Sequence, residues 1–126
     1  MSNNKQKKIL VAEDEKAYSR ALVLKLQNAG FDAVIASNGE EALEAIKKTN
    51  FDLLLCDLVM PKMNGFQLLE ELSKQGYKIP VIGLSNLSQE DDEKKMRVAG
   101  AVDFISKSNT PIIDVISKVE KFFNKK

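Results

Sequence analysis

Residues 53–57 read LLLCD, a continuous apolar run that ends directly at Asp57. Apolarity without alternation predicts a strand with both faces covered, as in a parallel sheet between two layers of helices. Similar runs occur at residues 9–12, 33–36 and 81–84, and a weaker run that contains Asp103 occurs at residues 102–105. We therefore expect five strands, with the last one at an edge of the sheet.

Segments with helical periodicity fill the intervals, at residues 16–29, 40–49, 65–75, 89–97 and 111–123. Ser88 and Thr110 are suitable caps for the last two helices. Left-handed residues are expected after the first four, at Gly30, Asn50, Gly76 and Gly100. The alternation of strand and helix predicts an α/β fold with a doubly wound, five-stranded parallel sheet of the flavodoxin-like (βα)5 type, in the strand order 2-1-3-4-5.

The composition narrows the chemistry that the chain can carry out. The 126 residues include no His and one Cys, which excludes an internal disulfide, His-based zinc sites and nucleophiles activated by His. The length suits one domain, which we expect at residues 8–124 after a flexible N-terminal tail at residues 1–7. Any reaction must therefore depend on carboxylates, hydroxyls and lysines.

The chain between its two basic ends is acidic, although the net charge of the whole chain is +1. Five of the 19 basic residues lie at the two ends, which leaves 14 basic residues against 18 acidic ones between them. This balance argues against direct nucleic-acid binding. The N-terminus does not resemble a signal peptide, and no apolar run reaches the roughly 18 residues of a membrane span, so we expect a cytoplasmic protein without membrane contact.

Polar residues follow the predicted strands at the edge where an open parallel sheet binds its ligands. Glu13, Asp14 and Glu15 follow the first strand, Asp57 the third, Ser85 and Asn86 the fourth, and Ser106, Lys107 and Ser108 the fifth. Because the first and third strands are neighbours in the expected order, the carboxylates of Glu13, Asp14 and Asp57 should converge, with the lysine approaching from the fifth strand.

Carboxylates that converge in one crevice repel each other unless a hard cation joins them, and oxygen ligands without His or thiolate favour magnesium. A carboxylate can also be the nucleophile of a phosphoryl transfer, while a metal ion and a lysine neutralise the transferred group. Asp57 is the best candidate nucleophile because it ends a buried strand and precedes the turn at Met60-Pro61.

Taken in order, these residues resemble the receiver domain of two-component response regulators, of the CheY-like, single-domain kind. The resemblance rests on Glu13-Asp14-Glu15, Asp57, Met60-Pro61-Lys62-Met63-Asn64-Gly65, Ser85 and Lys107. It implies that Asp57 takes a phosphoryl group from the phosphohistidine of a sensor histidine kinase or a histidine phosphotransfer protein. It also implies Mg²⁺, or Mn²⁺, held by Asp14, Asp57 and the backbone carbonyl of Val59, with Glu13 assisting through water.

The same resemblance assigns further roles. Lys107 would pair with the phosphoryl oxygens, Ser85 would hydrogen-bond them, and Phe104 would rotate inward as the switch aromatic. A downstream protein target would then bind the face formed by the fourth helix, the fifth strand and the fifth helix. The protein would be a phosphoacceptor that assists its own phosphorylation and dephosphorylation, not an enzyme.

The sequence departs from the common pattern of that family near the expected site. Ser108 follows the lysine where the family usually has a proline with a cis peptide bond, and Asn86 stands where a small residue is usual. Val59 and Leu87, near the expected path of attacking water, are both apolar. We expect these four residues to slow hydrolysis or to change the choice of phosphodonor.

Other functions fit the sequence less well. An aspartyl-phosphate phosphatase of the haloacid dehalogenase type needs a second Asp two residues after the nucleophile, where Val59 stands. A flavodoxin-like cofactor module needs a hydroxyl- and glycine-rich loop after the first strand, where Glu13-Asp14-Glu15 would repel a phosphate. A degenerate receiver that acts only by binding is the remaining alternative. For single residues, the competing interpretations are an ordinary acidic helix start at residues 13–15, and core packing for Phe104 and Cys56.

Overall fold

Five strands alternate with five helices over residues 6–86 and 90–124, which are the residues that this computed structural model describes. In chain order the elements are β1 (Lys8–Ala12), α1 (Lys16–Asn28), β2 (Asp32–Ala36), α2 (Gly39–Lys48), β3 (Leu53–Asp57), α3 (Gly65–Lys74), β4 (Val81–Ser85), α4 (Glu90–Val98), β5 (Asp103–Ser106) and α5 (Ile112–Asn124). All strand pairs are parallel, and the order in the sheet is β2-β1-β3-β4-β5. The predicted fold class and strand order are confirmed.

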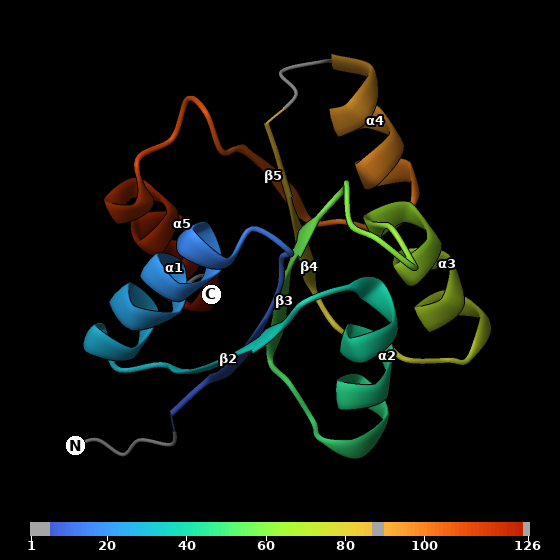
Figure 1. Cartoon of the computed structure of the whole chain (residues 1–126), viewed down its shortest axis with the longest axis horizontal. Helices are drawn as coiled ribbons and strands as arrows, with labels where there is room; N and C mark the ends of the chain where they lie inside the picture. The colour runs from blue at the N-terminus through green and yellow to red at the C-terminus, as the bar shows by residue number, and fades with distance from the viewer. Residues whose placement is uncertain (1–5, 87–89, 125–126) are drawn as a thin grey trace.

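The helices form two layers, one on each face of the sheet. Figure 1 shows α1 and α5 together on one face, and α2, α3 and α4 on the other. Consecutive residues of β3 point to opposite faces, so Leu54 joins the core under α2, α3 and α4, while Leu55 joins the core under α1 and α5. Both side chains are fully buried. This double burial is the physical reason why the run LLLC is continuously apolar.

The edge strand β5 begins one residue later than the sequence predicts. Its register with β4 starts at the pair Ile82 and Asp103, so Val102 lies just before the strand with 49% of its surface exposed. The Asp103 carboxylate accepts hydrogen bonds from the Phe104 N–H at 2.8 Å and from Arg97 at 3.4 Å. The edge position that Asp103 suggested is confirmed.

The other edge strand, β2, has side chains bound to its backbone. The amide of Gln27, on α1, donates to the Ala33 carbonyl at 3.2 Å. Just past the strand, the Ser37 N–H donates to the Glu41 carboxylate, on α2, at 2.8 Å. Each neighbouring helix therefore contributes one side chain that pairs with the backbone at this edge.

Three of the four expected left-handed residues are confirmed: Gly30, Gly76 and Gly100 have φ values of 98°, 80° and 113°. The prediction for Asn50 was wrong, because Lys62 is the non-glycine residue with a positive φ in the described chain, and α2 ends at Lys48 with an extended C-cap at Thr49, φ −139° and ψ 141°. An extended C-cap leads the chain straight toward β3 without a left-handed turn. The predicted cap Ser88 lies outside the described residues, and α5 begins at Ile112, two residues after Thr110.

The two ends of the described chain meet at the base of the sheet. The Lys7 ammonium lies 5.7 Å from the centroid of the Phe123 ring near the end of α5, and that ring contacts Phe31 at 5.5 Å. Residues 1–5 of the predicted tail lie outside the described residues. None of the helices in the described part of the chain has the length and apolarity needed to cross a bilayer.

We predict that the leucine side chains on the two faces of β3 contribute equally to the free energy of unfolding. Replacing Leu54 or Leu55 by Ala leaves a cavity in one core or the other and should lower the free energy of unfolding by about 3 kcal/mol in each case. Val34, which is 45% exposed on β2, is the control, and Val34→Ala should cost less than about 1 kcal/mol. Urea unfolding followed by circular dichroism measures these values, and a cost for only one of the two leucines would contradict the prediction.

Candidate functional site

Three carboxylates meet at the carboxyl ends of the central strands, as the strand order predicts. Asp57 ends β3 and Glu13 follows β1, and they are 5% and 1% exposed, whereas Asp14 is exposed. One oxygen from each residue lies within 4.8 Å of the others. Burial of Glu13 excludes the interpretation of residues 13–15 as only a solvated helix start.

Lys107 brings a buried positive charge to these carboxylates. Its side chain is 3% exposed, and its Nζ donates to Glu13 at 2.7 Å, to Glu15 at 2.6 Å and to Asp57 at 3.3 Å. The Lys107 backbone N–H also donates to the Ser85 carbonyl at 2.7 Å, which fixes the loop after β5 against the end of β4. The lysine is therefore held both by its backbone and by its ammonium group.

Two partners of Lys107 were missed by sequence reasoning. Glu15 precedes the first residue of α1, and Tyr18, three residues later, places its ring 4.8 Å from the Lys107 ammonium. The place of Glu15 in the run Glu13-Asp14-Glu15, directly after the first strand, was the signal that could have found it, and Tyr18 lies three residues further along the chain.

Burial and neighbouring charges shift the pKa values in this cluster. Burial raises the pKa of Glu13 to about 7, and the Asp57 carboxylate adds to the rise, against the lowering effect of the Lys107 hydrogen bond. Burial alone would lower the pKa of Lys107, but its hydrogen bonds to Glu13 and Glu15 and the charge of Asp57 raise it above its ordinary value. Lys107 is therefore a permanent cation at neutral pH.

Cys56 lies beside the nucleophile candidate but does not share its chemistry. Its thiol is fully buried and donates to the Asp57 carbonyl at 3.4 Å. Burial strongly raises the pKa of this thiol, so it stays protonated and behaves as a small core residue. The interpretation of Cys56 as a buried hydrophobic residue is confirmed.

The loop after β3 holds the Asp57 carboxylate and packs closely against the Asp57 backbone. The Val59 N–H donates to the Asp57 carboxylate at 3.3 Å, and the Gly65 N–H donates to the Leu58 carbonyl at 3.0 Å. A Cβ on Gly65 would lie 2.5 Å from the Asp57 carbonyl oxygen. Glycine is needed here because the start of α3 approaches the nucleophile candidate so closely. The turn itself contains Lys62, which has φ 68°.

A pocket of about 300 Å³ opens above Asp57, and the residues that line it are Asp14, Glu15, Asp57, Val59, Ser85 and Asn86. Ser85 is buried at the end of β4, while the Val59 side chain is 64% exposed. The expected departures Val59 and Asn86 therefore lie at the mouth of the site, and Leu87 lies outside the described residues.

In the loop after β5, Ser108 follows Lys107 and links to the loop after β4. The described residues include no cis peptide bond, and the Ser108 hydroxyl donates to the Asn86 carbonyl at 3.4 Å. This hydrogen bond joins the loop after β4 to the loop after β5, next to Lys107. The effect of these residues on hydrolysis stays a prediction.

Phe104 is half-buried and packs against the core under α2, α3 and α4. It pairs with Gly83 on β4, where an added Cβ would lie 3.2 Å from the Phe104 ring and 2.7 Å from the end of Met96 on α4. Ser85 follows Gly83 by two residues and so points to the same face of the sheet. The two predicted switch residues therefore share one face; Phe104 packs against the core, and its role as the switch aromatic stays a prediction.

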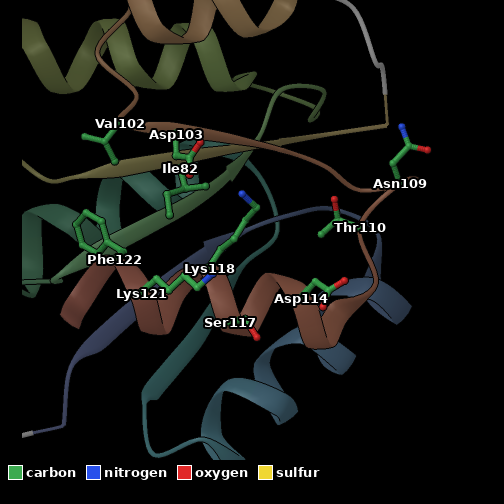
Figure 2. Close-up of a pocket in the computed structure, with 10 residues that line it drawn as sticks. All are labelled: Ile82, Val102, Asp103, Asn109, Thr110, Asp114, Ser117, Lys118, Lys121 and Phe122. Atoms are coloured by element: carbon green, nitrogen blue, oxygen red, sulfur yellow. The ribbon is translucent and has the colours of Figure 1, made fainter. Parts of the chain in front are cut away.

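A larger groove lies on a different side of the molecule, between β5 and α5. It has a volume of about 570 Å³. Figure 2 shows Val102 and Phe122 beside its apolar floor at Ile82, with Lys118 and Lys121 projecting from α5. This groove lies on the face for which the resemblance implies partner binding.

Comparison with protein-family models matches residues 9–118 to the response regulator receiver domain. The chain is 36% identical over 122 residues to the probable transcriptional regulator ycf27 of Porphyridium aerugineum, covering 92% of this chain and 50% of that protein. It is 33% identical over 105 residues to the alkaline phosphatase synthesis transcriptional regulatory protein PhoP of Bacillus subtilis, covering 83% of this chain and 44% of that protein. The chain spans about half the length of these curated relatives.

Solved structures give the same result. The receiver domain of the Francisella response regulator 1452 has a TM-score of 0.87 at 32% identity, covering 94% of this chain and 97% of that chain. The response regulator TrrA of Thermotoga maritima, in complex with Mg²⁺ and BeF, has a TM-score of 0.80 at 31% identity, covering 92% of this chain and 98% of that chain. Sequence and structure thus point to one family of domains.

We predict that Gly65→Ala lowers the free energy of unfolding by about 2 kcal/mol, because its Cβ must push the Asp57 backbone away. Ser73→Ala, on the exposed side of the same helix, is the control and should change this free energy by less than about 0.5 kcal/mol. Thermal unfolding of the two variants measures the difference, and equal stability would show that α3 can move away from Asp57 without cost.

We predict that Glu13 makes stability depend on pH in metal-free protein. The pKa of Glu13 is about 7 in the folded state, against an ordinary value of 4.5. Between pH 4.5 and pH 7, Glu13 therefore carries a proton in the folded protein that it has lost in the unfolded chain. The corresponding stability is present below pH 4.5 and is lost as the pH rises through about 7.

The measurement is urea unfolding in EDTA from pH 4.5 to 7.5 for the wild type and Glu13→Gln. The free energy of unfolding of the wild type should fall relative to that of the variant by on the order of 2 kcal/mol across this range. Parallel pH profiles for the two proteins would contradict the raised pKa.

Proposed function

Because this chain belongs to the response regulator receiver domain family, we propose that it is a phosphoacceptor switch of a two-component or phosphorelay system. Asp57 is the phosphoacceptor. The observation that carries this proposal is the ammonium of Lys107, buried among carboxylates at the pocket that contains Asp57. Burying a cation at the carboxyl end of a sheet is costly unless it pairs with anions, so it suits a site that receives a further negative group.

The transfer proceeds by attack of an Asp57 carboxylate oxygen on the phosphorus of a partner's phosphohistidine. A bond forms between this oxygen and phosphorus, and the bond between phosphorus and the imidazole nitrogen breaks. The electron pair leaves with the imidazole, which then takes up a proton. Lys107 faces the Asp57 carboxylate and offers its positive charge to the incoming phosphoryl oxygens. Ser85, buried at the same pocket, supplies a hydroxyl.

Magnesium fits the residues of this site. Three carboxylates share the site with one lysine, and their oxygens lie close enough together to bind one ion. Asp14, Asp57 and the backbone carbonyl of Val59 would hold Mg²⁺, or Mn²⁺, with Glu13 acting through water. When bound, this ion neutralises the carboxylates and the phosphoryl oxygens during the transfer. The similar protein TrrA forms a complex with Mg²⁺ and BeF, which supports this assignment.

The phosphoryl group changes the partner-binding face through Ser85 and Phe104. Ser85 moves toward the new oxygens, and Phe104, on the same face of the sheet, turns into the space that Ser85 leaves. The face of α4, β5 and α5, which contains the groove of Figure 2, then binds a downstream protein. The phosphodonor is a sensor histidine kinase or a histidine phosphotransfer protein, and the exchange takes place in the cytoplasm.

This function differs from that of a phosphatase or another enzyme that turns over a separate substrate. Val59 stands where a phosphatase of the haloacid dehalogenase type needs its second Asp, and its side chain is 64% exposed at the mouth of the pocket. The chain has no general acid in this position, so the phosphoryl group stays on Asp57 until water or a partner removes it. The domain assists its own phosphorylation and dephosphorylation.

Phosphorylation by acetyl phosphate tests this proposal. In the presence of Mg²⁺, the Asp57 oxygen attacks phosphorus, the bond between phosphorus and the acetyl oxygen breaks, and acetate leaves with the electron pair. Intact mass spectrometry should detect one phosphoryl group on the wild type and none on Asp57→Asn. Asp52→Asn is the matched control, because Asp52 is an exposed Asp just before the other end of the same strand.

Removal of Mg²⁺ with EDTA should lower the rate of this reaction by at least about tenfold, since one metal ion contributes several kcal/mol of charge stabilisation. A phosphoryl adduct that survives Asp57→Asn, or the lack of any adduct on the wild type, would refute the proposed function.

A further inference from the structure

All three ammonium protons of Lys107 have carboxylate partners. The acceptors are Glu15 at 2.6 Å, Glu13 at 2.7 Å and Asp57 at 3.3 Å. An ammonium group has three protons and no acceptor, so these partners use its full capacity. If Lys107 is to bind a phosphoryl oxygen, as the proposed function requires, one of the three carboxylates must give up its hydrogen bond.

The three carboxylates differ in how easily they can move away. The side chain of Glu13 is 0% exposed and that of Asp57 is 7% exposed, so neither carboxylate can rotate out into the solvent. The side chain of Glu15 is 54% exposed. It also precedes α1 without a side-chain hydrogen bond to the helix terminus, so among the described residues its contact with Lys107 holds it over the site.

Glu15 also lines the pocket above Asp57. A phosphoryl group entering this pocket would meet the Glu15 carboxylate as a like charge, in addition to competing with it for Lys107. We therefore propose that Glu15 is a placeholder anion: it pairs with Lys107 while Asp57 is unphosphorylated, and it is displaced into water when a phosphoryl group arrives. This inference rests on the proposed function and makes Glu15 a positioning residue that acts through Lys107.

Tyr18 keeps Lys107 at the site during this exchange. Its ring lies 4.8 Å from the Lys107 ammonium and interacts favourably with that charge, and its hydroxyl is buried without a hydrogen-bond partner among the described residues. The ring therefore offers Lys107 a contact that does not depend on the Glu15 carboxylate. When Glu15 leaves, the ammonium can stay where it is and donate its third hydrogen bond to the phosphoryl oxygen.

The placeholder role is tested with beryllofluoride, a phosphoryl analogue, at saturating Mg²⁺. Glu15→Gln removes the competing charge and should tighten beryllofluoride binding by about fivefold, the worth of one half-exposed charged hydrogen bond. The rate constant for phosphorylation by acetyl phosphate should rise by a similar factor. NMR titration gives the dissociation constant, and intact mass spectrometry gives the rate.

Glu15→Asp separates the contact from the charge. It retains the carboxylate but shortens the side chain by one methylene, so it no longer reaches Lys107 at 2.6 Å, and it should also tighten beryllofluoride binding. Glu44→Gln, which removes an exposed carboxylate paired with Lys47 on α2, is the charge control and should leave the dissociation constant unchanged.

The dissociation constants of the three variants distinguish displacement of Glu15 from general charge repulsion. Tightening by both Glu15 variants, but not by Glu44→Gln, supports the placeholder role. Tightening by Glu15→Gln alone would show that general charge repulsion acts at this position, and no change in either variant would show that Lys107 binds the analogue without displacing Glu15. Both of these results overturn the inference while leaving the proposed function intact. Failure of the wild type to bind beryllofluoride would refute the proposed function, and the placeholder role with it.

Discussion

A single buried cation, the ammonium of Lys107, joins parts of the chain that are far apart in sequence. Its hydrogen bonds to Glu13 and Asp57 span 94 and 50 residues. These contacts form only when β1 and β3 are neighbours and the loop after β5 is tied to the end of β4. The order of the strands, the two helical layers that cover them and the tight turn at Gly65 all serve to place these groups. The site therefore forms only when β1, β3, β4 and β5 have assembled in the correct order.

The cluster contains more negative than positive charge, and this imbalance is costly in the free energy of folding. The raised pKa of Glu13 is one sign of that cost, since burial makes its ionised form unfavourable. The two apolar cores on either side of β3 offset it, because they bury complete leucine side chains along the whole strand. The excess negative charge also means that a bound cation, or a change in the charge of Asp57, would alter the electrostatic free energy of the cluster.

Much of the fold could be predicted from the sequence because few arrangements satisfy a chain of alternating buried strands and amphipathic helices. The strand order places β1 beside β3, so the sequence also predicts that Asp57 lies close to Glu13 and Asp14. Finer features depend on interactions that no local pattern encodes. The start of β5 depends on pairing with Ile82, so Val102 falls outside the strand despite its apolarity. The contact of Glu15 with Lys107 depends on side-chain torsions, and the end of α2 depends on the direction in which Thr49 leaves the helix.

Two side chains bound to the backbone at the edge strand β2 oppose the addition of a strand from another chain. An uncovered edge of a sheet exposes backbone groups to which another chain can add a strand, leading to aggregation. Here Gln27 holds the Ala33 carbonyl and Glu41 holds the Ser37 N–H, so an added strand would first have to break two existing hydrogen bonds. The helices next to β2 thus protect the sheet from uncontrolled growth.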